Sequence, residues 1–147
     1  MQEDKTVKKI KPNELIQTIN TDKAPKAIGP YSQGKVILSS AQLLYVSGQL
    51  SINPETSEFL HNDDVQLQTE QVLKNIQSIL TEAGSDLDHV IKCNVFLDNM
   101  DNFLLFNQVY AKYFNFENKP ARACIAVEGL PKKAKVEIEC IAVIPQN

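Results

Sequence analysis

The chain contains a single arginine, Arg122, within the segment KPARACIAV at residues 119–127. The rest of its 15 basic residues are lysines. A guanidinium is a planar fork that binds a carboxylate or a phosphate through two parallel hydrogen bonds, which a lysine cannot do. Two interpretations stay open at equal weight: Arg122 binds a ligand, or it pairs with a glutamate of a neighbouring strand. Pro120 fixes where the strand starts and slightly favours the ligand. The glutamates in question are Glu128, Glu137 and Glu139.

Glu137 and Glu139 alternate along one apolar segment near the end of the chain. Such a pattern is most often a solvated strand face. If an oligomer buries that face, a carboxylate beside an apolar wall has a raised pKa and can act as a general acid or base. Cys124 is interpreted as a small strand residue, because no histidine lies near it in the sequence to activate the thiol. His61 and His89 stand apart from each other, and neither is assigned a catalytic role.

Length and composition indicate one soluble domain. The chain has 147 residues, a net charge of -3 and 43% hydrophobic residues, which argues against a general polyanion binder. Its three cysteines lack the paired short spacing of a zinc site, so we expect free thiols and no metal. No secretory signal or segment of membrane-spanning length is found, and these features predict a cytoplasmic protein without a membrane partner.

The elements that must position these residues follow from periodicity and turn signals. A polar N-terminal extension at residues 1–15 precedes the domain at 16–147. Tyr31, directly after a proline-containing loop at 22–30, either shields a cleft or fills the core. Gly48 interrupts a strand where a bulge or a close backbone approach is expected. We expect strands at 15–19, 35–38, 44–50, 89–97, 122–128 and 135–144, and helices at 65–83 and 100–114.

The resulting order is β-β-β-α-β-α-β-β, a single α+β domain with two helices packed on one sheet face. Alternation in the last strand places Val136 and Ile138 on one face and Glu137 on the other. If the apolar sides of both final strands pack under the helices, Arg122 and Glu137 lie together on the opposite face. That face mixes apolar and charged residues, which suggests that oligomerisation covers it.

Four ordered motifs resemble the RidA/YjgF family, also labelled L-PSP endoribonuclease or reactive intermediate deaminase. They are AIGPYSQ at 27–33, VSGQL at 46–50, KPARACIAV at 119–127 and LPKKAKVEIEC at 130–140. The resemblance covers residues 16–143. It implies a chorismate-mutase-like fold, assembled as a homotrimer with ligand clefts between subunits. It also implies hydrolysis of 2-imino acids or their enamine tautomers to 2-keto acids and ammonia, without a cofactor.

The resemblance further implies roles for individual residues. Arg122 matches the arginine that binds the substrate carboxylate, and Glu137 matches an acidic residue associated with the water or the departing amine. Cys124 matches a position whose backbone faces the ligand. The remaining positions expected around the cleft are Tyr31, Ser47, Gly48 and Asn107.

Two other functions stay open. The first is RNA cleavage or inhibition of translation, supported by the lysines at 132, 133 and 135, although such lysines more often form a solvated turn and a nucleic-acid partner is not expected. The second is a non-catalytic trimer that binds a metabolite in the same cleft. Tight keto-acid binding without turnover of imines would favour the second.

Overall fold

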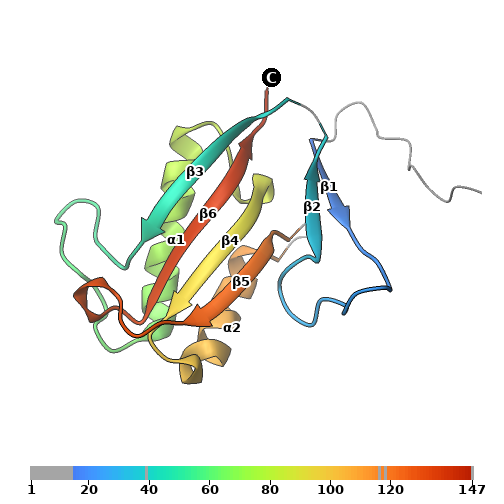
Figure 1. The fold of residues 1–147 in the computed structure, drawn as a ribbon. Helices are drawn as coiled ribbons and strands as arrows, with labels where there is room; N and C mark the ends of the chain where they lie inside the picture. Colours follow the sequence, from blue (N-terminus) through green and yellow to red (C-terminus); the bar gives the residue numbers. More distant parts are fainter. Residues whose placement is uncertain (1–14, 39, 116, 118, 147) are drawn as a thin grey trace, which may run out of the picture.

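Two helices cover one face of a four-stranded sheet, and a separate two-stranded sheet stands beside its edge (Figure 1). The computed structural model describes residues 15–38, 40–115, 117 and 119–146, so the proposed extension at 1–15 lies almost wholly outside the described residues. The predicted order of elements is confirmed. The elements are β1 (Ile16–Ile19), β2 (Gly34–Ile37), β3 (Gln42–Gln49), α1 (Val65–Glu82), β4 (Val90–Leu97), α2 (Phe103–Tyr113), β5 (Ala121–Ala126) and β6 (Val136–Ile144).

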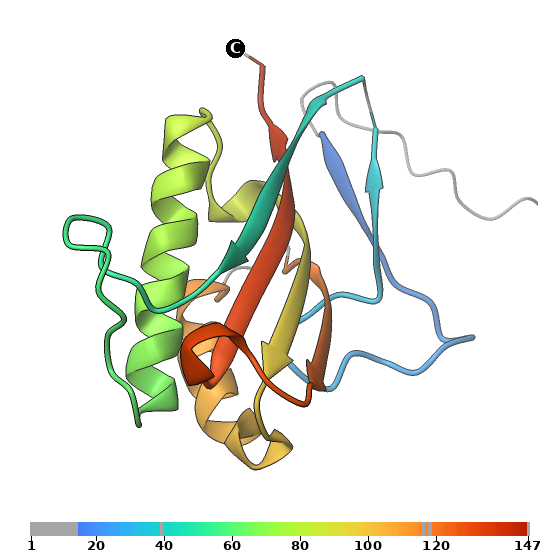
Figure 2. The same ribbon diagram turned by 60° about the vertical axis from the view of Figure 1, so that its left-hand side comes forward.

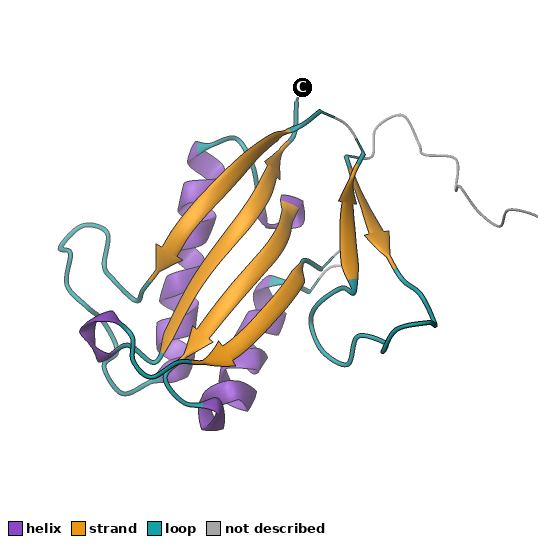
Figure 3. Ribbon diagram, in the orientation of Figure 1, coloured by secondary structure: helices purple, strands orange, loops and turns teal. Residues whose placement is uncertain are grey.

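The last strand of the chain lies inside the sheet. The order is β3-β6-β4-β5, with β6 antiparallel to both of its neighbours and β5 parallel to β4 at the edge. The strands β1 and β2 pair with each other beyond β5, as the orange arrows of Figure 3 show. The chain reaches β5 from β4 through α2, because a parallel connection needs a crossover element.

The helix α1 begins and ends at residues that the sequence marks. The side chain of Asp64 accepts a hydrogen bond from the backbone N–H of Leu67 at 2.9 Å, and Gly84 follows the helix with φ +80°. The buried face of α1 packs against the four-stranded sheet, and Figure 2 shows the helix lying along the sheet. Within the described residues, no helix is both long and apolar enough to cross a bilayer.

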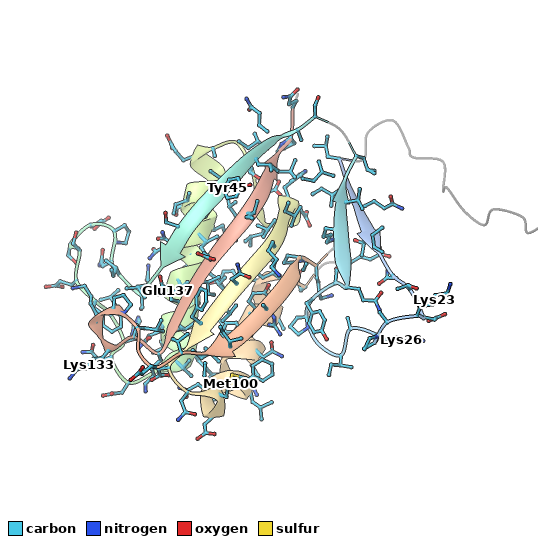
Figure 4. All side chains as sticks on the ribbon, viewed as in Figure 1. Lys23, Lys26, Tyr45, Met100, Lys133 and Glu137 are labelled. Carbon is cyan, nitrogen blue, oxygen red and sulfur yellow. The ribbon has the colours of Figure 1, made fainter. Side chains whose placement is uncertain are left out.

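The two sheet faces differ in character, as expected for β6. Val136, Ile138 and Cys140 are buried under the helices, while Glu137 and Glu139 are half-buried on the other side. We call this second side the open face. In the single chain it carries exposed apolar groups, with Tyr45 70% and Ile125 51% exposed. Figure 4 shows Tyr45 and Glu137 on this face.

The predicted facing of β5 is wrong. Arg122 is the register partner of buried Cys93, so its side chain lies on the helix side. The exposed face of β5 instead carries the small or apolar residues Ala123 and Ile125. The prediction assumed that the charged residues of a strand face away from the helices. An arginine can nevertheless bury its stem and its flat guanidinium against aromatic rings on the helix side.

Candidate functional site

The guanidinium of Arg122 lies between the edge strand β5 and the helix α2. Its Nη1 donates a hydrogen bond of 2.7 Å to the side-chain oxygen of Asn107. No ion pair joins Arg122 to any carboxylate of the described residues, so the expected alternative of a cross-strand pair with a glutamate is wrong. Glu137 and Glu139 lie on β6, whose neighbours are β3 and β4, so neither glutamate is on a strand next to Arg122 on β5. The positive charge of Arg122 is therefore not neutralised within the described chain.

Four aromatic rings surround this guanidinium. The carbon Cζ lies 4.7 Å from the ring centroid of Tyr110, and 5.7 to 5.8 Å from those of Tyr31, Phe103 and Phe106. Three of these rings come from α2, whose aromatic stripe is predicted by helical spacing. Their contact with Arg122 was missed, because spacing identifies the buried face of a helix but not the strand that lies beneath it.

Tyr31 reaches Arg122 because its loop is bound to the start of β5. The backbone N–H of Ser32 donates to the carbonyl of Pro120 at 3.0 Å, and the hydroxyl of Ser32 donates to the carbonyl of Lys119. A tight turn, in which the N–H of Tyr31 donates to Gly29 at 2.8 Å, then aims the ring toward the guanidinium. The ring thus lines a site and does not fill the core.

Cys124 lies on the same strand, two residues beyond Arg122. The carbonyl of Pro120 points away from β4 toward Ser32, and by the alternation of a strand the N–H groups of Arg122 and Cys124 point toward that outer edge. Burial raises the pKa of the Cys124 thiol, and nearby Arg122 lowers it only in part. The thiol is protonated at neutral pH, so the exposed backbone is the better ligand-binding group. We call Tyr31, Asn107, Arg122 and Cys124 the arginine site.

A second cluster lies on the open face and is called the glutamate site, made of Ser47, Gly48 and Glu137. The register between β3 and β6 shifts between Val46 and Gln49, which confirms the expected bulge. A Cβ built on Gly48 would overlap the carboxylate oxygen of Glu137 and lie 2.9 Å from its Cδ. Glycine therefore lets the Glu137 side chain rest directly on the backbone of β3.

The structure does not bring the two clusters together within one chain. Arg122 is on the helix side of β5, while Glu137 is on the open face of β6, with β4 between the two strands. A hollow of about 370 Å³ on the open face includes Ser47 and the charged residues Lys92 and Glu139, but not Arg122. Among the described residues, no group of three histidine, cysteine or acidic side chains is arranged to hold a metal ion.

Known proteins resemble this chain along most of its length. The model of the family described as Endoribonuclease L-PSP matches residues 21–144. A Lactococcus lactis protein named as a candidate regulator, AldR, is 50% identical over 86% of this chain and 97% of its own. Reactive Intermediate Deaminase A of Arabidopsis thaliana is 43% identical over 87% of this chain and 66% of its own. The structure of Escherichia coli TdcF with bound serine is 40% identical, with a TM-score of 0.64, covering 86% of this chain and 98% of TdcF.

Proposed function

Because the chain belongs to the Endoribonuclease L-PSP family, also known as RidA/YjgF, we propose that it hydrolyses reactive 2-imino acids to 2-keto acids and ammonia. The substrates are small imines such as 2-iminopropanoate and 2-iminobutanoate, or their enamine tautomers. One relative is named a reactive intermediate deaminase, and another relative has been solved with bound serine, an amino acid that presents the same carboxylate.

The observation that carries this proposal is the unneutralised charge of Arg122. The guanidinium uses one N–H on Asn107, and a ligand carboxylate can accept from its remaining donors. Aromatic rings surround it, so an incoming carboxylate is shielded from water and the charge-assisted hydrogen bonds are strengthened. The outward N–H of Cys124 provides a further donor at the same edge.

The chemistry requires little beyond this binding. The imine carbon is electrophilic, and more so when its nitrogen is protonated. Water adds to that carbon and loses a proton, giving a carbinolamine. The carbinolamine nitrogen gains a proton and leaves as ammonia, while the hydroxyl loses its proton and becomes the ketone. Glu137 is the proposed proton carrier in these steps. Water is the only co-reactant, so the reaction requires no redox cofactor.

We propose that neighbouring copies complete the site. The proposed clamp Arg122 and the proposed proton carrier Glu137 are on opposite faces of the sheet, so one chain does not present both to one substrate. The open face also exposes Tyr45 and Ile125, which association would cover. A homotrimer can bring the arginine site of one copy to the glutamate site of the next, because each copy in a ring uses two different surfaces.

Cleavage of RNA fits the arrangement less well. Two proton-transfer groups beside a cationic phosphate site are the usual requirement. His61 precedes α1 and His89 follows it, so a helix of 18 residues, about 27 Å long, separates the two histidines. The turn at Lys132 and Lys133, with φ of +58° and +55°, is the feature that best supports phosphate binding. Neither of the two histidines is part of this turn.

The test is a competition for a short-lived imine. An amino-acid oxidase produces 2-iminobutanoate from 2-aminobutanoate, and semicarbazide traps it. The wild-type protein should suppress trapping, and Arg122→Ala should lower kcat/KM by at least about 100-fold, because two charge-assisted hydrogen bonds are lost from a shielded site. Arg122→Lys should recover only part of this activity, because its ammonium is not a planar fork.

The matched control removes a positive charge elsewhere. Lys112 is exposed in the last turn of α2, and Lys112→Ala should leave the competition unchanged. Full activity in Arg122→Ala would overturn the proposed role of the arginine. Wild-type protein that leaves trapping unchanged, but binds 2-oxobutanoate tightly, would instead indicate a metabolite-binding module.

A further inference from the structure

The ring of Tyr110 is the floor beneath the guanidinium of Arg122. At 4.7 Å from Cζ to ring centroid, it is about 1 Å closer than any of the other three rings, a spacing typical of a strong cation–π contact. Tyr110 is 0% exposed, whereas the arginine above it is only half-buried. One face of the guanidinium therefore packs on the protein interior, and its free donors lie toward the surface.

The floor is held firmly. The Tyr110 ring is packed between Phe106, with centroids 5.5 Å apart, and Phe114, at 4.6 Å. Asn107 lies three residues before Tyr110 on α2, so both project from neighbouring positions of one helix. The ring restrains the tilt of the guanidinium, and the Asn107 oxygen restrains its rotation in the plane. Two restraints from one rigid helix are enough to fix a planar fork.

The hydroxyl of Tyr110 is not the group that acts on Arg122. Its oxygen is buried and has no hydrogen-bond partner of good geometry among the described residues. The neighbouring Cys93 thiol is the one polar group that perturbs it by direct contact, and burial raises the pKa of both groups, that of Cys93 to about 11. Both groups are neutral at physiological pH, so the hydroxyl adds no charge beside Arg122. The aromatic face is the part that acts on the guanidinium.

We propose that Tyr110 is a positioning residue for Arg122: its ring face sets the plane of the guanidinium so that the free donors meet a ligand carboxylate at the outer edge of β5. This inference rests on the proposed function for the identity of the ligand, but not for the position of the arginine. Carboxylate binding that is equal in ground and transition states affects KM rather than kcat.

The kinetic test compares three variants. Tyr110→Phe keeps the ring and should keep KM and kcat within about twofold of wild type. Tyr110→Leu removes the floor and should raise KM for 2-iminobutanoate by at least about tenfold, weaken 2-oxobutanoate binding equally, and change kcat much less. Leu80→Ala opens a space in the buried core at α1, away from the Tyr110 ring and its two aromatic neighbours, and should keep the wild-type KM.

A spectroscopic test is independent of activity, because Arg122 is the only arginine. Arginine labelled with nitrogen-15 gives one set of guanidinium signals, and a ring beneath shifts the attached protons upfield. The upfield shift should persist in Tyr110→Phe and Leu80→Ala and become smaller in Tyr110→Leu, where only the three more distant rings remain. Unchanged guanidinium signals in a folded Tyr110→Leu protein would overturn the inference, as would Leu80→Ala raising KM as much as Tyr110→Leu. Absence of wild-type turnover and binding would overturn the proposed function alone.

Discussion

On the open face, the side chain of Glu137 fills the space that a side chain at position 48 would need. No residue larger than glycine fits there beside Glu137 as observed. We expect Gly48→Ala to displace the Glu137 carboxylate and lower kcat/KM at least about tenfold, because a small displacement of a proton-transfer group is costly. The strand should remain, since the clash is with the end of a flexible side chain. The imine competition assay and a thermal melt measure both effects.

The same substitution at another glycine provides the control. A Cβ at Gly129 meets nothing within 4 Å, so Gly129→Ala should leave activity and stability near wild type. If Gly48→Ala is fully active, Glu137 either tolerates displacement or is not the proton carrier.

The motifs of the family resemblance identified the site residues better than the alternation of side chains along the strands did. The resemblance named Tyr31, Asn107 and Arg122, and the structure places all three in contact around one guanidinium. Alternation placed Arg122 on the wrong face, because it assumed that the more apolar side of β5 is buried. The exposed Ile125 shows why this failed: a face that is open in one chain can be apolar when another protein surface covers it.

The helix α1 depends on its first turn. The side chain of Asp64 caps the N–H of Leu67, and Asp64→Ala should lower the free energy of unfolding by about 1 kcal/mol. Denaturation in urea, with an unchanged slope, measures this loss. The neighbouring exposed Asp63→Ala is the control and should change stability by less than about 0.5 kcal/mol. Equal losses in the two variants would show a general charge effect instead of a cap.

The order of elements was predictable, but their pairing was not. The helix expected at 65–83 from periodicity and turn signals differs from α1 by one residue at its end. The neighbours of β6 could not be read from local pattern, because strands that are far apart in sequence pair through the tertiary fold. Val46 pairs with Cys140, for example, and no local signal in either segment names the other. The separation of β1 and β2 into their own sheet was missed for the same reason.

The molecule as a whole presents its two proposed half-sites on different surfaces, which predicts complementation between inactive copies. When Arg122→Ala and Glu137→Gln chains are unfolded together and refolded at equal amounts, a cyclic trimer should regain about a quarter of wild-type activity. Random mixing pairs an intact arginine site with an intact glutamate site in that fraction of interfaces. Each variant refolded alone is the control and should stay inactive.

The outcome is measured with the imine assay on fractions sized by light scattering. Trimers that regain no activity would mean that both residues serve one site in one chain, or that Glu137 has another role. The sequence could predict a surface in need of cover, because the open face mixes apolar and charged groups. Burial alone does not specify how many copies meet, so the homotrimer comes from the family resemblance and not from the pattern of the open face.

The central position of β6 also bears on how the protein is made. Strands β3 and β4 border β6 on either side, and the pairing reaches from Gln42 to Ile144. During synthesis β4 can pair with β5 before β6 is made, but β3 has no neighbour in this sheet until the segment after Lys135 has left the ribosome. The helices and the β1–β2 pair can form earlier, but the sheet closes only around the last strand. Assembly of the four-stranded sheet is therefore expected to wait for β6, and until β6 is available the apolar strand β3 must be kept from aggregating.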